Sequence, residues 1–535
     1  MTASAHVDRF CEENLPPSEE WPTLRLDRPE FQYPARLNCA VSLVDAHVAE
    51  GLGDRIAIDG PTGRLTYAEL QNLTARLARV LSEDLGVVPG NRVLLRGPNN
   101  LMMAALWLAV IRAGAVVVAT MPMLREKELG EIVEKAQISH ALCDHRFLDA
   151  LEHTQTHSSH LRTLAIYGGG PQSVESLAEG KSPDLPPVDT AADDTCLIAF
   201  TSGTTGKPKG TMHFHRDVLA ICDAFPRSTL DANADDRFIG SPPLAFTFGL
   251  GGLLLFPLRL GATAVLVEKG SPDALLEAIA RERATVCFTS PTAYRIMAAH
   301  TAEHDLSSLR KCVSAGETLP SATRALWRDR TGIEILDGIG STEMLHIFIS
   351  HTEADARPGA TGRPIPGYEA RIVDTDGKEL GRGEVGRLAV RGPTGCRYLA
   401  DERQAEYVRD GWNYTGDAYR VDDDGYFHYL ARTDDMIVTA GYNVAGPEVE
   451  AALLSHPAVA ECGVVAAPDE ERGHIVKAYV VLHPGHVADP TLAEGLQNHV
   501  KAVIAPYKYP RAIEFVDKLP RTETGKLQRF RLRQG

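Results

Sequence analysis

Positive charge is scarce in this sequence, and so are long apolar runs. The 535 residues include 55 Lys and Arg against 71 Asp and Glu, a formal net charge of −16. That balance argues against a nucleic-acid partner, because phosphates repel an acidic protein. The longest apolar run, residues 101–111, is broken by Arg112 and falls well short of the ~20 residues that cross a bilayer. Residues 1–17 lack the apolar core of a secretory signal. We therefore expect a cytoplasmic protein without a membrane partner.

Paired cysteine motifs are also missing. The nine cysteines are scattered, with no C-x-x-C pair among them, which favours reduced thiols over a disulfide framework or a zinc site. Hydrophobic residues make up 44% and charged residues 24% of the chain, ordinary values for a globular protein. At ~100 to 200 residues per domain, the length predicts roughly three to four folding units.

Helical and strand-like segments alternate early in the chain. Residues 66–85 and 101–113 have helical periodicity, and residues 92–96 and 115–120 are short apolar strands. This alternation predicts the α/β class, with parallel sheets covered by helices on both faces. After a stretch rich in glycine, proline and acids, residues 195–200 form another apolar strand, which we expect to open a second α/β unit.

The pattern of expected helices and strands changes twice further along the chain. Short alternating strands with Gly-rich turns fill residues 360–429, and helices and strands mix after residue 432. The predicted fold has a large N-terminal domain and a small, mobile α+β C-terminal domain. The large domain is expected to span residues 1–432 and the small domain residues 433–535. Within the large domain we expect two doubly wound α/β subdomains, approximately 1–185 and 186–358, and a β-rich subdomain, 359–432. Residues 501–533 carry nine basic and three acidic side chains, which favours an anionic ligand.

A loop rich in hydrogen-bond donors follows the strand at residues 195–200. It reads Thr-Ser-Gly-Thr-Thr-Gly-Lys-Pro-Lys-Gly over residues 201–210. Its glycines permit successive backbone N–H groups to point at one anion, and its hydroxyls and lysines add donors and charge. Only two residues separate Gly203 from Gly206 and Pro208 follows, so the loop is not a Walker A motif. The pattern predicts a phosphate-binding loop.

This loop resembles the signature of the acyl-adenylate-forming superfamily, which includes acyl-CoA synthetases. Further motifs of that superfamily follow in order along essentially the whole chain. They are residues 314–317 (Ser-Ala-Gly-Glu), 337–343 (Asp-Gly-Ile-Gly-Ser-Thr-Glu), 414–417 (Tyr-Thr-Gly-Asp), 431–435 (Ala-Arg-Thr-Asp-Asp) and 520–526 (Pro-Arg-Thr-Glu-Thr-Gly-Lys).

The resemblance implies a role for each motif. Lys526 is the expected catalytic lysine, with Thr342 and Glu343 beside it in catalysis and Glu343 as the magnesium ligand. Asp434 is the expected hinge between domains, and Gly441 the expected wall of the thiol channel. The nucleotide-binding residues would be Thr201, Ser202, Gly203, Thr204, Thr205, Gly206, Lys207, Ala315, Gly316, Glu317, Asp337, Gly338, Ser341, Thr342, Asp417 and Arg432.

Two of these roles also make sense on the residues' own chemistry. A carboxylate such as Asp417 can accept two hydrogen bonds from the cis-diol of a ribose, although Asp in a Thr-Gly turn is commonly an Asx-turn residue. Glu343 offers a hard oxygen beside hydroxyl and backbone donors, which suits Mg²⁺ bridging ATP oxygens. A capped Glu in the first turn of a helix is a compatible alternative.

The expected acid pocket has no carboxylate in its wall. It would consist of Ala245, Phe246, Gly338, Ile339, Gly340 and His346. Because a buried unpaired ammonium is costly, an α-amino acid is disfavoured. Small residues beside an aromatic ring suit a compact slot for a planar acid. Residues 343–348 resemble the benzoate and 2-aminobenzoate branch of aryl-CoA ligases, where a histidine lies beside the acid. A packed structural role for His346 remains open.

The N-terminal residues 4–8, 16–17, 32–34 and 37–39 resemble 2-aminobenzoate–CoA ligases more than benzoate–CoA ligases. The resemblance implies an enzyme that uses ATP, Mg²⁺ and coenzyme A to convert an aromatic acid, 2-aminobenzoate, into its adenylate and then its CoA thioester. The alternatives are a benzoate–CoA ligase, a stand-alone enzyme that loads a carrier protein, and a nucleotide-binding regulator without catalysis. Small molecules are the expected partners, and a homodimer is compatible with the sequence.

Overall fold

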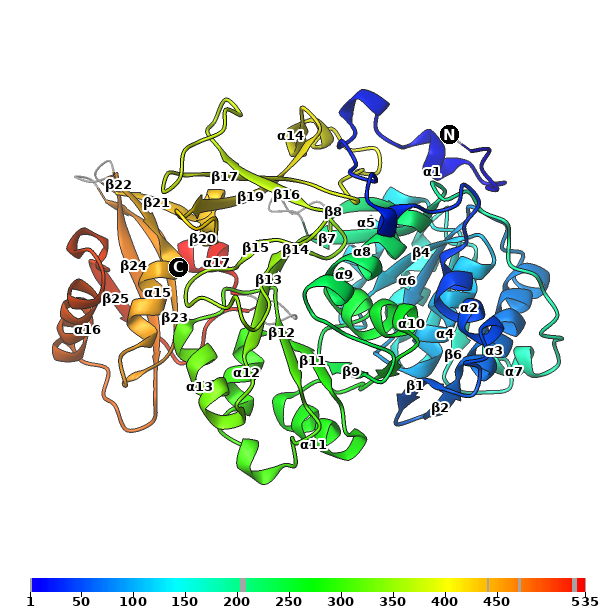
Figure 1. Cartoon of the computed structure of the whole chain (residues 1–535), viewed down its shortest axis with the longest axis horizontal. Helices are drawn as coiled ribbons and strands as arrows, with labels where there is room; N and C mark the ends of the chain where they lie inside the picture. The colour runs from blue at the N-terminus through cyan, green and yellow to red at the C-terminus, as the bar shows by residue number, and fades with distance from the viewer. Residues whose placement is uncertain (1, 203–207, 440–441, 470–472, 522–526, 535) are drawn as a thin grey trace.

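The computed structural model describes residues 2–202, 208–439, 442–469, 473–521 and 527–534. A large N-terminal part contains two mixed sheets and a smaller antiparallel sheet, and a small C-terminal part lies at the left of Figure 1, in orange to red. This arrangement confirms the predicted α/β fold with a small C-terminal domain. Among the described residues, no helix is both long and apolar enough to cross a membrane.

The first sheet has six strands in the order β6-β5-β3-β4-β7-β8, all parallel except the β7–β8 pair. Every residue of β3 and β5 is buried, as expected for a sheet covered by helices on both faces. The strands are β3 (Arg92–Arg96), β4 (Val116–Thr120), β5 (His140–Asp144), β6 (Thr163–Tyr167), β7 (Thr195–Ser202) and β8 (Pro208–Phe214). Helices of this region are α3 (Tyr67–Arg79), α4 (Leu101–Arg112), α5 (Glu126–Ala136), α6 (Asp149–His157), α7 (Val174–Glu179) and α8 (His215–Ser228).

The helix α3 shows how local sequence sets these elements. The hydroxyl of Thr66 accepts a hydrogen bond from the backbone N–H of Glu69, and the Glu69 carboxylate accepts one from the backbone N–H of Thr66. This capping box satisfies two N–H groups that would otherwise lack partners at the helix start. Two short helices, α1 (Phe10–Glu13) and α2 (Ala46–Ala49), precede it.

The second sheet has nine strands in the order β15-β14-β13-β12-β11-β9-β10-β1-β2. It is parallel through its centre and antiparallel at both edges. The strands are β1 (Ile56–Gly60), β2 (Gly63–Thr66), β9 (Arg237–Gly240), β10 (Thr263–Val265), β11 (Val286–Thr289), β12 (Lys311–Ser314), β13 (Ile335–Gly340), β14 (Ile347–Ser350) and β15 (Arg363–Pro364). Its helices are α9 (Thr247–Leu250), α10 (Phe256–Leu260), α11 (Pro272–Glu282), α12 (Pro291–Met297) and α13 (Ser321–Thr331), with a π-helix at Gly251–Leu255.

Each sheet contains strands from the part of the sequence expected to form the other sheet, and this corrects one expectation. The strand predicted at residues 195–200 does not open the second sheet, because β7 pairs with β4 in the first. Conversely, β1 and β2 from the start of the chain close the edge of the second sheet. An apolar run predicts that a strand is buried but not which neighbour buries it. The subdomain boundaries given above stay predictions.

The predicted β-rich segment forms a five-stranded antiparallel sheet, in which β16-β17-β19-β18 are neighbours and β20 also pairs with β19. Its elements are β16 (Glu369–Val373), β17 (Val385–Arg391), α14 (Gln404–Tyr407), β18 (Val408–Arg409), β19 (Trp412–Val421) and β20 (Phe427–Arg432). Both β19 and β20 lead to the candidate site described below.

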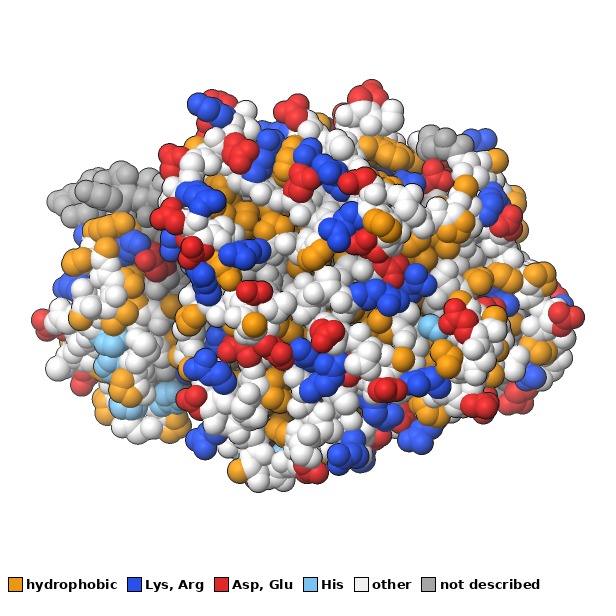
Figure 2. Space-filling model, viewed as in Figure 1, with side chains coloured by type: hydrophobic (Ala, Val, Ile, Leu, Met, Phe, Trp, Pro, Cys, Tyr) orange, Lys and Arg blue, Asp and Glu red, His pale blue; other side chains and the backbone are white. Residues whose placement is uncertain are grey.

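The C-terminal part has its own core. A sheet β23-β24-β25 and a hairpin β21–β22 pack with helices around buried residues such as Val449, Leu453 and Leu496. The elements are β21 (Met436–Thr439), β22 (Tyr442–Ala445), α15 (Gly446–Leu454), β23 (Val459–Asp469), β24 (Gly473–Leu482), α16 (Pro490–Val503), β25 (Ala512–Phe515) and α17 (Arg529–Gln534). On the face shown in Figure 2, acidic and basic side chains are interspersed over both parts of the molecule.

Candidate active site

A cavity of about 780 Å³ lies where the second sheet, the β-rich sheet and the C-terminal part meet. Most of the described residues that the superfamily motifs single out line it. These are Gly316, Glu317, Asp337, Gly338, Ile339, Gly340, Ser341, Glu343, Asp417 and Arg432. Residues as far apart in the sequence as Gly316 and Arg432 therefore meet around one space large enough for a nucleotide-sized ligand.

One wall comes from the ends of two parallel strands. β12 ends at Ser314, two residues before Gly316, and its neighbour β13 runs to Gly340. Ligands of α/β sheets commonly bind at the carboxyl ends of such strands. The Glu317 carboxylate accepts a hydrogen bond from the Thr292 hydroxyl at 2.7 Å, which fixes it at this edge.

Two wall positions leave little room for a side chain, and the backbone contact makes the second the stricter. A Cβ atom on Gly338 would lie 2.7 Å from Cδ1 of Ile347, and one on Gly340 would lie 2.6 Å from the carbonyl oxygen of His346. Beside them, burial raises the pKa of the Asp337 carboxyl to about 7 against the opposing charge of Arg324. After Gly340 the chain turns, and the backbone N–H of Met344 donates to Oγ of Ser341 at 3.1 Å. Glu343 thus lies in a turn and not in a helix.

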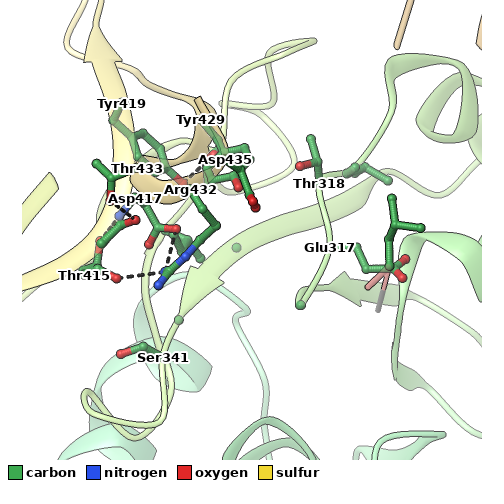
Figure 3. A pocket seen from close by; sticks show the side chains of 18 of the residues that line it. Glu317, Thr318, Ser341, Thr415, Asp417, Tyr419, Tyr429, Arg432, Thr433 and Asp435 are labelled. Carbon is green, nitrogen blue, oxygen red and sulfur yellow. Dashed lines mark hydrogen bonds and ion pairs between the residues drawn. The ribbon is translucent and has the colours of Figure 1, made fainter. Parts of the chain in front are cut away.

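Asp417 and Arg432 form a pair on adjacent strands. They are register partners of β19 and β20, and Nη1 of Arg432 donates to Oδ1 of Asp417 at 3.0 Å and to the carbonyl of Thr415 at 2.9 Å. Figure 3 shows this pair on one side of the pocket, with Glu317 on the other. Burial raises the pKa of Asp417, and the Arg432 charge opposes that rise. The pair places a carboxylate and a cation where a ribose is expected.

Glu343 is held by two residues that the motif comparison did not single out as site residues. The Tyr398 hydroxyl donates to Oε1 of Glu343 at 2.5 Å. Nζ of Lys209 lies 3.1 Å from the Tyr398 hydroxyl and 3.8 Å from Oε1 of Glu343. Burial and the nearby Glu343 charge raise the pKa of Tyr398 far above its ordinary value, so its hydroxyl keeps its proton. Lys209 belongs to the predicted phosphate loop, but no sequence signal marked Tyr398.

His346 lies in an aromatic cage next to the cavity. Its ring centroid lies 4.5 to 6.3 Å from those of Phe225, Phe248, Phe256 and Phe288. A Cβ on Gly251 would lie 2.4 Å from Cδ2 of the His346 ring, so the cage needs glycine there. Burial lowers the pKa of His346 to about 3, which keeps the imidazole neutral.

The predicted acid-pocket residues divide into two groups. Gly338, Ile339 and Gly340 line the cavity, whereas Ala245, Phe246 and His346 are not among its lining residues. Ala245 and Phe246 are half-buried just before α9. The contact between Gly340 and the backbone of His346 joins the two groups. Whether His346 touches a substrate stays a prediction.

Several predicted residues lie beside the cavity or outside the described residues. Ala315 and Thr342 adjoin lining residues, and the Thr342 carbonyl lies 2.9 Å from Nε2 of the buried His213. Thr201 and Ser202 end β7, and Asp434 belongs to the short turn Thr433–Asp435 that joins β20 to β21. The predicted residues outside the described ranges are Gly203, Thr204, Thr205, Gly206, Lys207, Gly441 and Lys526.

The residues that flank the predicted lysine segment do reach the cavity. Arg521 and Leu527 pair with each other and both line it. Nη1 of Arg521 lies 3.4 Å from Oε1 of Glu317, across the junction of the two parts of the chain. The cavity is therefore a site large enough for a nucleotide, and the C-terminal part supplies part of its lining.

Comparison with known proteins agrees with this arrangement. The AMP-binding enzyme model matches residues 45–398, and the AMP-binding enzyme C-terminal domain model matches residues 448–526. The benzoate–CoA ligase of Thauera aromatica is 37% identical over 513 residues, which cover 94% of this chain and 97% of that protein.

Two solved structures are similar over nearly the whole chain. The anthranilate CoA ligase AuaEII in complex with anthranoyl-AMP is 33% identical with a TM-score of 0.90, covering 95% of this chain and 98% of that one. A benzoate CoA ligase from Burkholderia xenovorans LB400 is 32% identical with a TM-score of 0.85, covering 93% of this chain and 100% of that one. The chain belongs to the AMP-binding enzyme family, and its assignment to the acyl-adenylate-forming enzymes is confirmed.

Proposed function

We propose that this enzyme activates 2-aminobenzoate with ATP and transfers the aryl group to coenzyme A. The products would be the aryl-CoA thioester, AMP and pyrophosphate. The observation that carries this choice is the neutral, aromatic cage of His346 beside the nucleotide cavity. It supports a flat aromatic acid without a full positive charge, because a buried ammonium would need a carboxylate partner.

In the first half-reaction, the substrate carboxylate attacks the α-phosphate of ATP and pyrophosphate leaves. Both reacting groups are anionic, so catalysis depends on placing positive charge and hydrogen-bond donors around them. Lys526 is the proposed donor to the reacting oxygens, delivered by the segment whose flanks reach the cavity. Asp417 would accept hydrogen bonds from the ribose hydroxyls, while the Arg432 charge favours the ionised carboxylate and its hydrogen bond holds it in place.

Glu343 fits the requirements of a magnesium ligand. It presents a hard oxygen at the cavity, and its partners Tyr398 and Lys209 keep the carboxylate oriented. When bound there, Mg²⁺ would neutralise part of the charge on the ATP phosphates. Lys209 would contribute a second positive charge from the chain itself.

In the second half-reaction, the thiol of coenzyme A attacks the adenylate carbonyl and AMP leaves. The lysine segment would obstruct that approach, so the C-terminal domain must turn between the steps. Asp434 is the proposed hinge, since it stands in the short turn between β20 and β21, and Gly441 would then line the thiol channel. The basic residues near the C-terminus would pair with the phosphates of coenzyme A.

The tautomer of His346 favours an aryl amine over plain benzoate. Its Nε2 lies 3.4 Å from the Phe248 carbonyl, which can only accept, so we infer that Nε2 carries the proton. Its Nδ1 is buried with no hydrogen-bond partner among the described residues. That lone pair would accept a hydrogen bond from the 2-amino group, whereas benzoate would leave it without a partner.

A substrate panel tests the proposal. We expect kcat/KM with ATP and coenzyme A to be about 10- to 100-fold higher for 2-aminobenzoate than for benzoate, the value of one buried hydrogen bond. His346→Phe should abolish this preference, and His346→Asn, whose amide oxygen can replace Nδ1, should retain part of it. Equal or better use of benzoate would favour the benzoate–CoA ligase alternative. Adenylate formation without thioester formation from coenzyme A would favour a carrier-protein acceptor.

A further inference from the structure

Three side chains that can bind metal meet in the core, away from the cavity. The ligand atoms of Cys39, Cys196 and His215 all lie within 4.8 Å of one another. Nδ1 of His215 lies 3.3 Å from Sγ of Cys39, and each of the three residues is at most 1% exposed. No other group of three His, Cys, Asp or Glu side chains comes together in this way in the described part of the chain.

The three residues come from segments that are far apart in the sequence. Cys39 lies just before the π-helix Val41–Asp45, Cys196 is the second residue of β7, and His215 is the first residue of α8. β7 and β8 pair as a hairpin whose open end is the Thr195–Phe214 pair. The cluster thus lies at the base of the hairpin, and the other end of the hairpin carries the predicted phosphate loop.

The ligand set selects the kind of cation. Two sulfur atoms and one imidazole nitrogen supply three of the four ligands that Zn²⁺ takes, whereas Mg²⁺ and Ca²⁺ need oxygen ligands that this cluster lacks. Two thiolates would balance the charge of one divalent ion, so the complex would add no net charge to the dry core.

The imidazole is already oriented for such a role. The backbone N–H of Cys39 donates to Nδ1 of His215 at 3.2 Å, so Nδ1 carries the lone pair and the proton is on Nε2. This is the tautomer in which Nδ1 can bind a cation, which would take the place of the Cys39 N–H on the same lone pair. The atom that would bind the metal is the same atom that faces the Cys39 sulfur.

We propose that Cys39, Cys196 and His215 form a buried Zn²⁺ site that ties the base of the β7–β8 hairpin to the N-terminal segment. Binding replaces the two thiol protons with one Zn²⁺ and releases both protons to solvent. The missing C-x-x-C pair argued against zinc only for ligands close in sequence, and these ligands meet only in the fold. The proposal is independent of the enzyme's substrate.

Cobalt titration of the whole protein tests the site, because thiolate-bound Co²⁺ has a charge-transfer absorption in the near ultraviolet that histidine-bound Co²⁺ lacks. With the thiols kept reduced by a phosphine, we expect the band to saturate at one equivalent and Zn²⁺ to displace it. Cys39→Ser and Cys196→Ser should each lose the band. The matched control is the double variant Cys287→Ser/Cys312→Ser, since these two buried free cysteines are register partners on β11 and β12. It should keep the band.

Several results would overturn the proposed zinc site. Failure of the unmodified protein to develop a saturable thiolate band overturns the proposal, as does a band that survives in Cys39→Ser or is lost only in the control. If the serine variants do not fold, the thermal unfolding of the unmodified protein decides. Its midpoint should rise with one equivalent of Zn²⁺ and return after a chelator is added, and an unchanged midpoint would also overturn the site.

Discussion

The hydroxyl of Tyr398 holds the cavity carboxylate Glu343, so Tyr398→Phe measures how far adenylation depends on a fixed Glu343. The hydroxyl donates to Oε1 at 2.5 Å, and Glu343 is 8% exposed. Water therefore replaces the lost donor poorly. A hydrogen bond to a charged group contributes about 1.5 to 3 kcal/mol, which corresponds to roughly a 10- to 100-fold change in rate if the reaction needs this orientation.

The two half-reactions can be measured separately. Acid-dependent ATP–pyrophosphate exchange reports adenylate formation, and mixing supplied aryl-AMP with coenzyme A reports thioester formation. We expect Tyr398→Phe to slow exchange by about 10- to 100-fold and to leave thioester formation nearly unchanged, because the charged pyrophosphate has left by then. Thermal unfolding measured in parallel separates a local effect from a loss of fold.

Tyr407→Phe is the matched control. Its ring lies 5.6 Å from that of Tyr398, but its hydroxyl is 3.4 Å from the neutral Ser341 hydroxyl and does not hold Glu343. It should change exchange by less than about 3-fold, as expected for a weak neutral hydrogen bond. If Tyr398→Phe and Tyr407→Phe behave alike, or if Tyr398→Phe slows both half-reactions equally, the positioning argument is wrong.

Three further expectations concern other parts of the molecule. Lys526→Ala should slow adenylate formation by at least ~10²-fold, the scale for one preorganised charge donor, yet spare thioester formation from supplied adenylate; equal losses would refute its assignment. Asp434→Pro should trap one domain arrangement and uncouple the half-reactions, and wild-type rates in both would exclude the hinge. Burial lowers the pKa values of His213 and His351 to about 4 and of His346 to about 3. These histidines are neutral in the folded protein, so their full contribution to stability is present above the unfolded pKa of 6.5. As the pH falls below 6.5, each should lower the free energy of unfolding by up to ~1.4 kcal/mol per pH unit. Urea unfolding at pH 7.5 and 5 should show this loss, and a flat profile would contradict it.

Much of the fold could be predicted from periodicity because its elements are strongly patterned. The helix expected at residues 101–113 is α4, and the strand expected at residues 92–96 is β3. The exchange of β1 and β2 for β7 and β8 could not be predicted in the same way. Strand pairing is a long-range choice among buried surfaces of similar hydrophobicity, and the local sequence does not encode it.

The same distinction applies to the site, because residues in short motifs could be identified from the sequence and residues that meet only in the fold could not. Asp417 and Glu343 could be singled out from the sequence because their proposed roles, ribose binding and metal binding, require particular residue types at fixed spacing in short motifs. Tyr398 was not, since its role arises only when residues 343 and 398 meet in the fold at 2.5 Å. The aromatic cage of His346 is similar: its four phenylalanines come from residues 225 to 288 and form a cage only once packed.

Arg521 links the two parts of the chain, and under the proposed domain rotation this link would favour the first half-reaction. Its Nη1 lies 3.4 Å from Glu317 in the large part, and its Nη2 lies 2.8 Å from Glu461 on β23 of the C-terminal part. Turning the C-terminal domain would keep the Glu461 contact and break the one to Glu317. The Glu317 contact therefore stabilises only the arrangement in which the flanks of the lysine segment face the cavity.

Glu317→Gln removes that bias and leaves the rest of the arginine's surroundings intact. A partly exposed ion pair contributes about 0.2 to 1 kcal/mol, so pyrophosphate exchange should slow by up to about 5-fold. Thioester formation from supplied adenylate should stay unchanged or become faster, and the difference should shrink in high salt. Lys508→Gln is the control, because Lys508 pairs with Glu448 within the C-terminal part at 2.6 Å. If the ratio of the two half-reaction rates changes equally in Glu317→Gln and Lys508→Gln, the cross-domain ion pair does not determine the relative rates, and the substrates must determine them instead.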